Sequence, residues 1–443
     1  MKIINNALSK AIGISILTLV FALNALPQDE KPVYGGQQPA KVVDTTTKPI
    51  EKQVKGIFSF DQDGVYFSNQ FDGARLNRIE RTGENSYTIL ITPENTPINM
   101  SPWYAFRIWS KSKKEISVKL IYPDFARHRY SPLISKNGEK WKPLEDKYIT
   151  EEEKGTAAFG VNSRPKRITM RLKIGKKPLW VSAQELQTSK HVFSWIDRMA
   201  KKSFTDSETI GTSKEGRPLR MLRIGNKNSE NMIIVISRQH PPEVTGYFAM
   251  KAFVEKIADN SKLSKKFRED WCIYVVPLMN PDGVDNGQWR HNAGGIDLNR
   301  DWTFFNQPED LAVSKFLKRR ELETGGKFYF GIDFHSTWDD IYYPMDKQYS
   351  GSMPNLVWDW LAKIESAIPN YKLNIKPTQK AEPAIVSRNY FFVSHRMEAI
   401  VFEIGDNTPR SFIKKKGNVG ASELMKLLIE RQPKKALAAG KSN

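Results

Sequence analysis

The chain contains 443 residues, of which 40% are hydrophobic, so it has room for two or three domains with apolar cores. Its formal net charge of +19 would suit an anionic partner such as a cell-wall polymer, a membrane surface or an acidic peptide. The lysines are nevertheless spread along the whole chain, and no nucleic-acid-binding motif accompanies them. We therefore expect a solvated basic surface and no nucleic-acid partner.

Residues 1–27 have the pattern of an export signal. Lys2 and Lys10 precede an apolar run over 11–25 that ends in small residues. The run is short for a membrane span, so we expect cleavage, no stable span afterwards, and a periplasmic or secreted protein. An uncleaved anchor is the alternative. No cysteine lies near the end of the signal, which argues against a lipid anchor; the single cysteine, Cys272, lies in an apolar run typical of a buried strand.

The next two segments predict a linker and a first domain. Residues 28–55 are rich in Pro, Gly, Gln, Thr and Lys, which is typical of a linker. Short strand-like runs follow, and a turn signal at Asn137-Gly138 predicts a hairpin. The runs lie at 64–68, 86–92, 103–109, 116–122 and 167–174. Together they predict an antiparallel β-sandwich domain over residues 56–183.

Helix and strand signals alternate from residue 184 to residue 432. Apolar runs predict buried strands at 232–237, 273–277, 328–334 and 399–404. Helical patterns cover 189–202, 243–259, 310–323, 354–368 and 422–431. The alternation predicts an α/β domain with a doubly wound mixed sheet, and the polar residues 433–443 predict a flexible tail.

Two histidines follow directly on predicted buried strands, where sites form in open α/β sheets. His240 precedes Glu243 by three residues at the start of a predicted helix, so both side chains can reach one point. His335 would complete a set of two histidines and one carboxylate, which leaves a position open for water on a zinc ion. Such an ion lowers the pKa of its water to roughly 7. Asp297 and Asp333 are predicted to orient the imidazoles by hydrogen bonds. Taken alone, the His-x-x-Glu spacing would better suit a surface pair or a helix cap.

The loop region 280–302 supplies two arginines and an amide. Because guanidinium groups bind carboxylates in a two-pronged fork, one arginine together with Asn299 would suit a C-terminal carboxylate. A further arginine near the zinc would stabilise the oxyanion of a tetrahedral intermediate. The structural alternative is that these arginines pair with Asp297 and Asp301 and hold the loop together.

A third group of candidates lies near the C-terminus. Glu403 lies in an apolar run, where a carboxylate is costly unless it is paired or functional. Beside zinc-bound water it would be a general base that passes the proton to the leaving amine. Tyr390 would donate a hydrogen bond to substrate or, alternatively, belong to an aromatic core. His291 is predicted to be a loop residue. For His395, a contact with substrate is an open alternative.

From about residue 190 to 430 the chain resembles the zinc carboxypeptidases, the carboxypeptidase A-like metallopeptidases. The resemblance rests on six segments in the family's order: His240-Pro-Pro-Glu243, Asn280-Pro-Asp-Gly, Trp289-Arg290, Asp297-Leu-Asn-Arg300, His335-Ser336 and Glu403. It implies a carboxypeptidase-like fold, one zinc ion per chain and action on peptide or protein C-termini. The roles it implies are zinc binding by His240, Glu243 and His335, catalysis by Glu403 and Arg290, and carboxylate binding by Asn299, Arg300 and Tyr390.

The predicted sandwich adds detail to the resemblance. Segments 102–107 and 130–135 resemble the cytosolic carboxypeptidase subfamily, whose members remove glutamates from protein tails. The apparent signal peptide makes the chain more similar to bacterial exported relatives. Two residues depart from the family: Pro242 replaces an arginine, and Tyr390 lies closer to the glutamate than in pancreatic-type members. Arg388, in the segment expected to line the specificity pocket, predicts a preference for acidic C-terminal residues, including glutamates of cell-wall peptides.

Two other functions remain as alternatives. One is a zinc-dependent deacylase or amidase of related fold, such as the succinylglutamate desuccinylase group, acting on N-acyl amino acids or cell-wall peptides. The other is a non-catalytic peptide-binding protein that keeps the fold. Loss of Glu403 or of a zinc ligand would mark the second, and the sequence keeps all of these residues.

Overall fold

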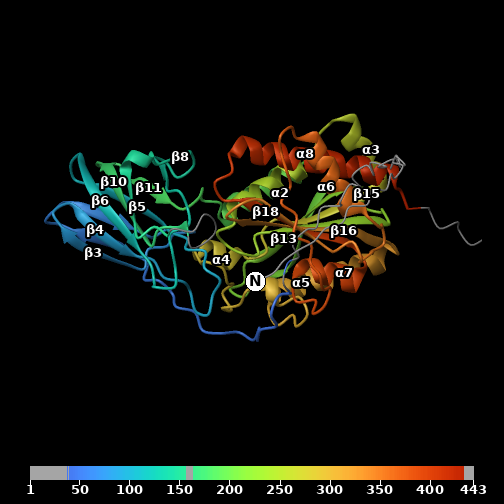
Figure 1. Cartoon of the computed structure of the whole chain (residues 1–443), viewed down its shortest axis with the longest axis horizontal. Coiled ribbons are helices and arrows are strands. Elements are labelled where there is room, and N and C mark those ends of the chain that lie inside the picture. Colours follow the sequence, from blue (N-terminus) through green and yellow to red (C-terminus); the bar gives the residue numbers. More distant parts are fainter. Residues whose placement is uncertain (1–36, 38, 156–162, 434–443) are drawn as a thin grey trace, which may run out of the picture. The chain divides into compact units, whose positions relative to one another are not determined.

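The computed structural model describes residue 37 and residues 39–155 and 163–433 (Figure 1). The predicted signal peptide, the start of the predicted linker and the predicted tail beyond Pro433 lie outside these residues. The described residues belong to one compact unit that spans Gly35–Asn443. In the part of the chain described, no helix has the length and apolar character needed to cross a membrane.

Two packed sheets form the predicted sandwich, with side chains such as Phe67, Ile108, Val118 and Met170 buried between them. The first sheet has the order β1 (Ile57–Phe60), β2 (Val65–Ser68), β5 (Ala105–Ser110), β11 (Leu179–Ser182), β7 (Leu133–Ser135) and β8 (Trp141–Pro143). The second has the order β3 (Arg78–Gly83), β4 (Ser86–Leu90), β6 (Lys114–Ile121), β10 (Arg167–Ile174) and β9 (Ile149–Glu152).

One pair departs from the predicted antiparallel arrangement: β4 and β6 run parallel. The reason is that the chain leaves the second sheet after β4, forms β5 in the first sheet, and then returns as β6. The predicted turn at Asn137-Gly138 joins β7 and β8 as antiparallel partners. Gly138 there adopts a φ of 77°, a conformation that glycine allows at no steric cost.

The C-terminal region is an α/β domain around a seven-stranded mixed sheet. Its order is β12 (Thr205–Thr212), β13 (Pro218–Gly225), β15 (Trp271–Val276), β14 (Asn231–Ser237), β16 (Lys327–Thr337), β18 (Glu398–Gly405) and β17 (Ile341–Pro344). The central strands β15, β14, β16 and β18 are parallel, and the outer pairs are antiparallel. Both faces of the central strands are buried, as continuous apolar runs require.

Helices cover both faces of this sheet (Figure 1). One face packs against α1 (Ser189–Met199), α2 (Val244–Ile257), α3 (Lys262–Asp270), α6 (Leu356–Ala367) and α8 (Arg410–Glu430). The other packs against α5 (Pro308–Thr324) and α7 (Ser387–His395). A short helix, α4 (Pro281–Asp285), follows β15. The doubly wound architecture is thus the predicted one.

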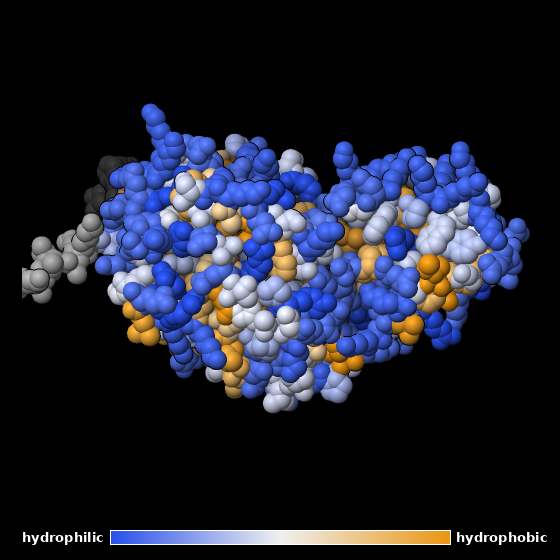
Figure 2. All heavy atoms as spheres, turned by 180° about the vertical axis from the view of Figure 1, so that it is seen from behind, coloured by the Kyte–Doolittle hydropathy of each residue, from blue (hydrophilic) through white to orange (hydrophobic). Residues whose placement is uncertain are grey.

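The predicted linker is in part a packed segment. Thr45 is buried, and its carbonyl oxygen accepts a hydrogen bond of 2.8 Å from Gln307 Nε2. The backbone N–H of Lys48 donates to the carbonyl of Gly294, also at 2.8 Å. These contacts hold the part of the segment around Thr45 and Lys48 against the α/β domain. Figure 2 shows that hydrophilic side chains cover most of the displayed face, with apolar residues in small groups.

Candidate metal centre and substrate cavity

The candidate metal ligands lie at the carboxyl ends of neighbouring parallel strands. β14 ends at Ser237, and Arg238 then takes a left-handed conformation with a φ of 57°, which turns the chain before His240. Glu243 follows as the N-cap residue of α2. His335 lies near the end of β16, which pairs in parallel with β14. The topology therefore brings these side chains to one edge of the sheet.

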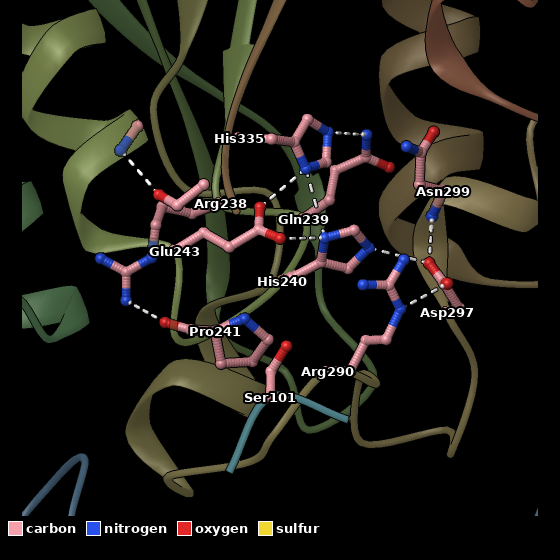
Figure 3. Close-up of polar contacts among 12 residues, drawn as sticks. Ser101, Arg238, Gln239, His240, Pro241, Glu243, Arg290, Asp297, Asn299 and His335 are labelled. Carbon is pink, nitrogen blue, oxygen red and sulfur yellow. Dashed lines mark hydrogen bonds and ion pairs between the residues drawn. The ribbon is translucent and has the colours of Figure 1, made fainter. Parts of the chain in front are cut away.

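The three side chains converge on one point (Figure 3). Nδ1 of His240 lies 2.8 Å from Glu243 Oε1, and Nδ1 of His335 lies 2.7 Å from Glu243 Oε2. The two Nδ1 atoms are 3.2 Å apart. All three residues are buried. They form a set of nitrogen and oxygen donors that lie within 4.8 Å of one another.

The second nitrogen of each ring meets a carboxylate. His240 Nε2 lies 2.9 Å from Asp297 Oδ1, and His335 Nε2 lies 2.7 Å from Asp333 Oδ2. Asp333 is itself held by donors from Gln239 Nε2 and Ser387 Oγ, each at 2.5 Å. A carboxylate on Nε2 places the ring proton there and leaves the lone pair on Nδ1, which points to the shared centre.

Close helix–strand packing fixes Glu243 relative to His335. A Cβ atom on Gly246 would lie 2.3 Å from the carbonyl oxygen of His335, so only glycine permits this approach of α2 to β16. Ser336 Oγ accepts a hydrogen bond from the Gly246 N–H and another from Thr245 Oγ1, both at 2.8 Å. The first turn of α2 is therefore tied directly to the strand that carries the second histidine.

The donor set fits a zinc ion. Two imidazoles and one carboxylate are ligands that zinc takes in sites with an open fourth position. His240, Glu243 and His335 would hold the ion, with Asp297 and Asp333 behind the rings. One further oxygen in the same place, Glu403 Oε2, is buried without a hydrogen-bond partner among the described residues. It therefore faces a space that suits water or a substrate.

Glu403 lies on β18 directly opposite His335 on β16. Burial raises the pKa of the Glu403 carboxyl above its usual range; His335 opposes the rise, and the negative charge of Glu243 adds to it. The carboxyl thus lies beside the metal ligands in an environment that favours its protonated form. A carboxyl with this tendency can take up a proton.

The loop candidates divide between the cavity and the metal ligands. Arg290 Nε lies 2.7 Å from Asp297 Oδ2, whereas Arg300 Nη1 lies 4.0 Å from the same oxygen. The structural alternative, in which the arginines pair with Asp297 and hold the loop, therefore applies to Arg290 at short range and to Arg300 at 4.0 Å. Asn299 Oδ1 accepts a hydrogen bond of 3.0 Å from the Ser387 N–H. Arg290, Arg300 and Asn299 all line a common cavity.

This cavity has a volume of about 540 Å³ and contains the metal ligands and Glu403. Arg388, on α7, also lines it and is buried. Its guanidinium donates to Gln37 Oε1 at 3.0 Å, to the Tyr343 carbonyl oxygen at 3.2 Å and to Asn389 Oδ1 at 3.1 Å. Burial lowers the pKa of Arg388 to about 10. These partners are all neutral oxygens, so the cavity contains a buried cation that a substrate anion could pair.

The structure does not bring Tyr390 to the cavity. Its side chain is buried against Trp302 and Phe305, and its hydroxyl lies 2.8 Å from Ser314 Oγ. His395 joins the same cluster, with Nε2 3.3 Å from the Tyr390 hydroxyl. This placement agrees with the alternative that Tyr390 belongs to an aromatic core, because α7 directs its side chain toward α5. A different tyrosine, Tyr343, lines the cavity.

His291 stays outside the donor set. Its Nδ1 lies 2.6 Å from Asn95 Oδ1, and its backbone N–H donates to Glu94 Oε1, also at 2.6 Å. Both partners belong to the segment between β4 and β5 of the sandwich. His291 therefore helps to join the loop to the sandwich.

Glu94 was not anticipated from the sequence. This fully buried carboxylate accepts three backbone hydrogen bonds, from Trp289 at 2.7 Å, Arg290 at 2.9 Å and His291 at 2.6 Å. The sandwich thereby holds the backbone that carries Arg290. Its partners lie 195 to 197 positions away in sequence, so no local pattern signals the contact.

Arg129 is a second unanticipated residue from the sandwich. It lines the cavity and pairs with Asp406 through its Nε atom at 2.7 Å. It also donates to Ser101 Oγ at 2.8 Å and to the carbonyl oxygen of Ser336 at 3.2 Å. Asn99 and Met100 line the same cavity. The sandwich therefore forms part of the cavity wall.

The fold and the site together define the class of protein: an α/β domain with a mixed sheet and a two-histidine, one-glutamate centre at the ends of its parallel strands. Residues 192–395 match the family described as zinc carboxypeptidase. This match agrees with the resemblance to the zinc carboxypeptidases that the sequence motifs predicted.

Curated relatives include cytosolic carboxypeptidases. Cytosolic carboxypeptidase 6 of Caenorhabditis elegans is 21% identical over 300 residues, which cover 62% of this chain and 63% of that protein. Cytosolic carboxypeptidase 3 of Bos taurus is 41% identical over 280 residues, which cover 54% of this chain and 26% of that protein. The chain thus spans less than two thirds of the length of these relatives.

Solved structures show the same fold. A metallo-carboxypeptidase from Burkholderia cenocepacia aligns with a TM-score of 0.66 at 16% identity, over 82% of this chain and 98% of that one. A metallo-carboxypeptidase from Pseudomonas aeruginosa, solved in complex with (2-guanidinoethylmercapto)succinic acid, aligns with a TM-score of 0.64 at 19% identity, over 82% and 99%. Because they cover 82% of the chain, these alignments extend beyond the matched family region of residues 192–395.

Proposed function

We propose that this protein is a zinc-dependent metallocarboxypeptidase that removes residues from the C-termini of peptides or proteins. The observation that carries the proposal is that the His240–Glu243–His335 centre, Glu403 and a group of arginines all line one cavity. When bound, a zinc ion lowers the pKa of a water molecule and polarises a carbonyl group. The chain's own residues then supply proton transfer, charge stabilisation and orientation.

Each role follows from a position. Glu403 takes the proton of the attacking water and delivers it to the leaving amine, since its carboxyl is buried beside the metal ligands and has an unpaired oxygen. Arg290 stabilises negative charge on the carbonyl oxygen, since its Nε is fixed by Asp297 while its side chain borders the cavity. Asn299 and Arg300 bind the free carboxylate, which limits cleavage to the last residue.

We further propose a preference for acidic C-terminal residues. Arg388 supports it, because within the described part of the chain the hydrogen-bond partners of this buried guanidinium are neutral oxygens, and it borders the cavity. A glutamate side chain would supply the missing negative charge. Glutamates of cell-wall peptides belong to this class if the chain is exported, as we propose from residues 1–27.

The test is to incubate the purified protein with peptides that differ only in their last residue and to identify the released amino acids by mass spectrometry. We expect release of single C-terminal residues, loss of release with a chelator, and recovery with zinc. Glutamate-ended peptides should be cleaved faster than leucine-ended ones, and Arg388→Met should reduce this ratio. Cleavage of N-acyl amino acids without cleavage of peptides would favour an amidase. Zinc binding without hydrolysis of any peptide would contradict the enzymatic function.

A further inference from the structure

A groove outside the candidate active site runs along the sandwich. Two hollows of about 580 and 830 Å³ meet at three shared residues, Lys136, Lys173 and Leu179. They lie beside the β7–β8 hairpin and the turn from β10 to β11. Apolar side chains, including Leu144 and Leu172, form part of the lining. Because its lining is rich in lysine, we call this feature the cationic groove.

Nine basic residues line the cationic groove, against two acidic ones, Glu115 and Glu145. The basic residues are Lys113, Lys114, Lys136, Lys140, Lys142, Arg171, Lys173, Lys176 and Lys177. Among the described residues, none of the nine forms an ion pair within 4.0 Å of a carboxylate. Positive charge therefore outweighs negative charge in the lining of this groove.

The opposite holds at the other end of β10. Lys119 pairs with Glu152 at 2.5 Å, Lys154 pairs with Glu151 at 2.7 Å, and Lys166 pairs with Glu153 at 2.8 Å. Arg167 also pairs with Glu153. Among the described residues, the same sandwich thus pairs its basic residues with carboxylates at one end of β10 and forms no such ion pairs around the groove. General surface solvation accounts for scattered lysines, but it does not account for this contrast.

The shape and chemistry of the groove favour an extended acidic polypeptide over other anions. A recessed apolar lining with a basic rim can take apolar and acidic side chains in alternation, whereas a lipid bilayer presents a flat surface. A nucleic acid would use aromatic rings for stacking. The only aromatic residue of the groove is Tyr148, and the cations of Lys147, Arg171 and Lys173 lie 5.1, 5.7 and 5.8 Å from its ring centre.

We propose that the cationic groove binds an acidic segment of a polypeptide partner. For a carboxypeptidase, such a segment would precede the C-terminus that enters the active-site cavity. This second statement rests on the proposed function; binding in the groove does not. The groove would thereby select acidic protein tails independently of the residue that is removed.

The binding test uses the full-length chain with Glu403→Gln, so that a peptide ligand is not consumed. The probe is a fluorescent peptide of alternating Glu and Leu residues, and its anisotropy is followed at several salt concentrations. The groove variant carries Lys136→Glu, Lys173→Glu and Lys177→Glu. A matched control carries Lys262→Glu, Lys265→Glu and Lys318→Glu, which change the net charge equally on exposed residues of α3 and α5.

We expect the groove variant to bind about tenfold or more weakly and with a smaller salt dependence, while the control variant keeps most of its affinity. A peptide with Gln in place of Glu should not bind. Equal loss of affinity in the two variants would overturn the proposal, because it would show a general effect of net charge. Binding of phosphatidylglycerol vesicles or of polygalacturonate in place of the peptide would also overturn it, in favour of a membrane or a polysaccharide.

An activity measurement separates this proposal from the proposed function. In the otherwise unchanged chain, the groove variant should raise KM for a long substrate with an internal acidic segment, without changing kcat or the KM of a dipeptide-sized substrate. A chain that binds the acidic peptide but hydrolyses nothing would refute the peptidase function and leave the groove proposal intact. If the chain is active and the groove variant and the control variant have the same KM for the long substrate, the groove proposal is refuted and the peptidase function stands.

Discussion

The contact of Glu94 with the loop that carries Arg290 gives a sharp prediction about the sandwich. In Glu94→Gln, the amide oxygen can still accept from the N–H groups of Arg290 and His291, but the new NH₂ group faces the Trp289 N–H. One buried donor then loses its partner and two bonds lose their charge. At about 1–3 kcal/mol for a buried unsatisfied group, plus the weaker remaining bonds, we expect the free energy of unfolding to fall by about 2–4 kcal/mol.

The same change should reduce turnover. A shift of the loop backbone displaces the Arg290 side chain, and small misplacements of a group that stabilises the transition state can cost about 10–100-fold in kcat. Zinc content should be unchanged, because the three candidate metal ligands lie just after β14, at the N-cap of α2 and on β16 rather than on this loop. Urea unfolding, kcat and metal content are the three measurements.

Two controls test whether the effect is specific to Glu94 and whether Glu94 acts through Arg290. Glu84→Gln removes the same charge from an exposed position of the sandwich and should leave unfolding and kcat at the wild-type values. In an Arg290→Ala background, Glu94→Gln should still lower stability but should no longer lower kcat. Wild-type stability and turnover of Glu94→Gln would refute the argument, and an equal kcat loss in both backgrounds would show that Glu94 does not act through Arg290.

Three further predictions concern single side chains. Glu403→Gln should keep zinc and lose at least about 10³-fold in kcat, because the proton acceptor is gone; an active variant would exclude Glu403 as the base. Asp333→Asn should weaken zinc affinity about 10–100-fold in a competition assay with a chelator, and unchanged affinity would mean that His335 needs no carboxylate behind it. Burial raises the pKa of Glu398 from 4.5 to about 7, so its favourable contribution to folding is full below pH 4.5 and is lost as pH rises through 7. Glu398→Gln, which keeps an acceptor for the Gly351 N–H, should therefore match the wild type in unfolding near pH 4.5 and exceed it by about 1–3 kcal/mol at pH 8; the same difference at both pH values would contradict the shift.

Local patterns in the sequence predicted the core of the fold well. The apolar run of β14 predicted a buried strand, and the two-residue spacing of Asp333 and His335 predicted that their side chains share one face of a strand. From these two patterns the site could be placed at the ends of the strands. Helix α8 was predicted only from residue 422, although it begins at Arg410. Two glycines within it weaken the helical pattern. Gly417 is needed because a Cβ there would lie 2.6 Å from the Ala249 carbonyl oxygen on α2.

Long-range contacts and the directions of side chains could not be predicted from the sequence. Arg129 and Asp406 are 277 positions apart, and nothing local to either residue indicates a buried pair. Helix α7 was not predicted, and its direction decides that Arg388 borders the cavity while Tyr390 packs in the core. The family resemblance placed both residues near substrate, because it transfers positions along a chain without the local helix that orients them.

The position of Trp289 has a consequence for how this protein tolerates substitutions. Its side chain is part of the sandwich's apolar core, together with Val244, which follows the candidate metal ligand Glu243, while the neighbouring Arg290 lines the cavity. A repacking of the sandwich interior would therefore move Trp289, which is directly followed in sequence by the cavity residue Arg290. Random substitutions in a domain without metal ligands should appear in screens as losses of turnover, and suppressors of active-site defects should be found there too. The two parts of the chain would then drift together in sequence, since the fit of one tryptophan is shared between them.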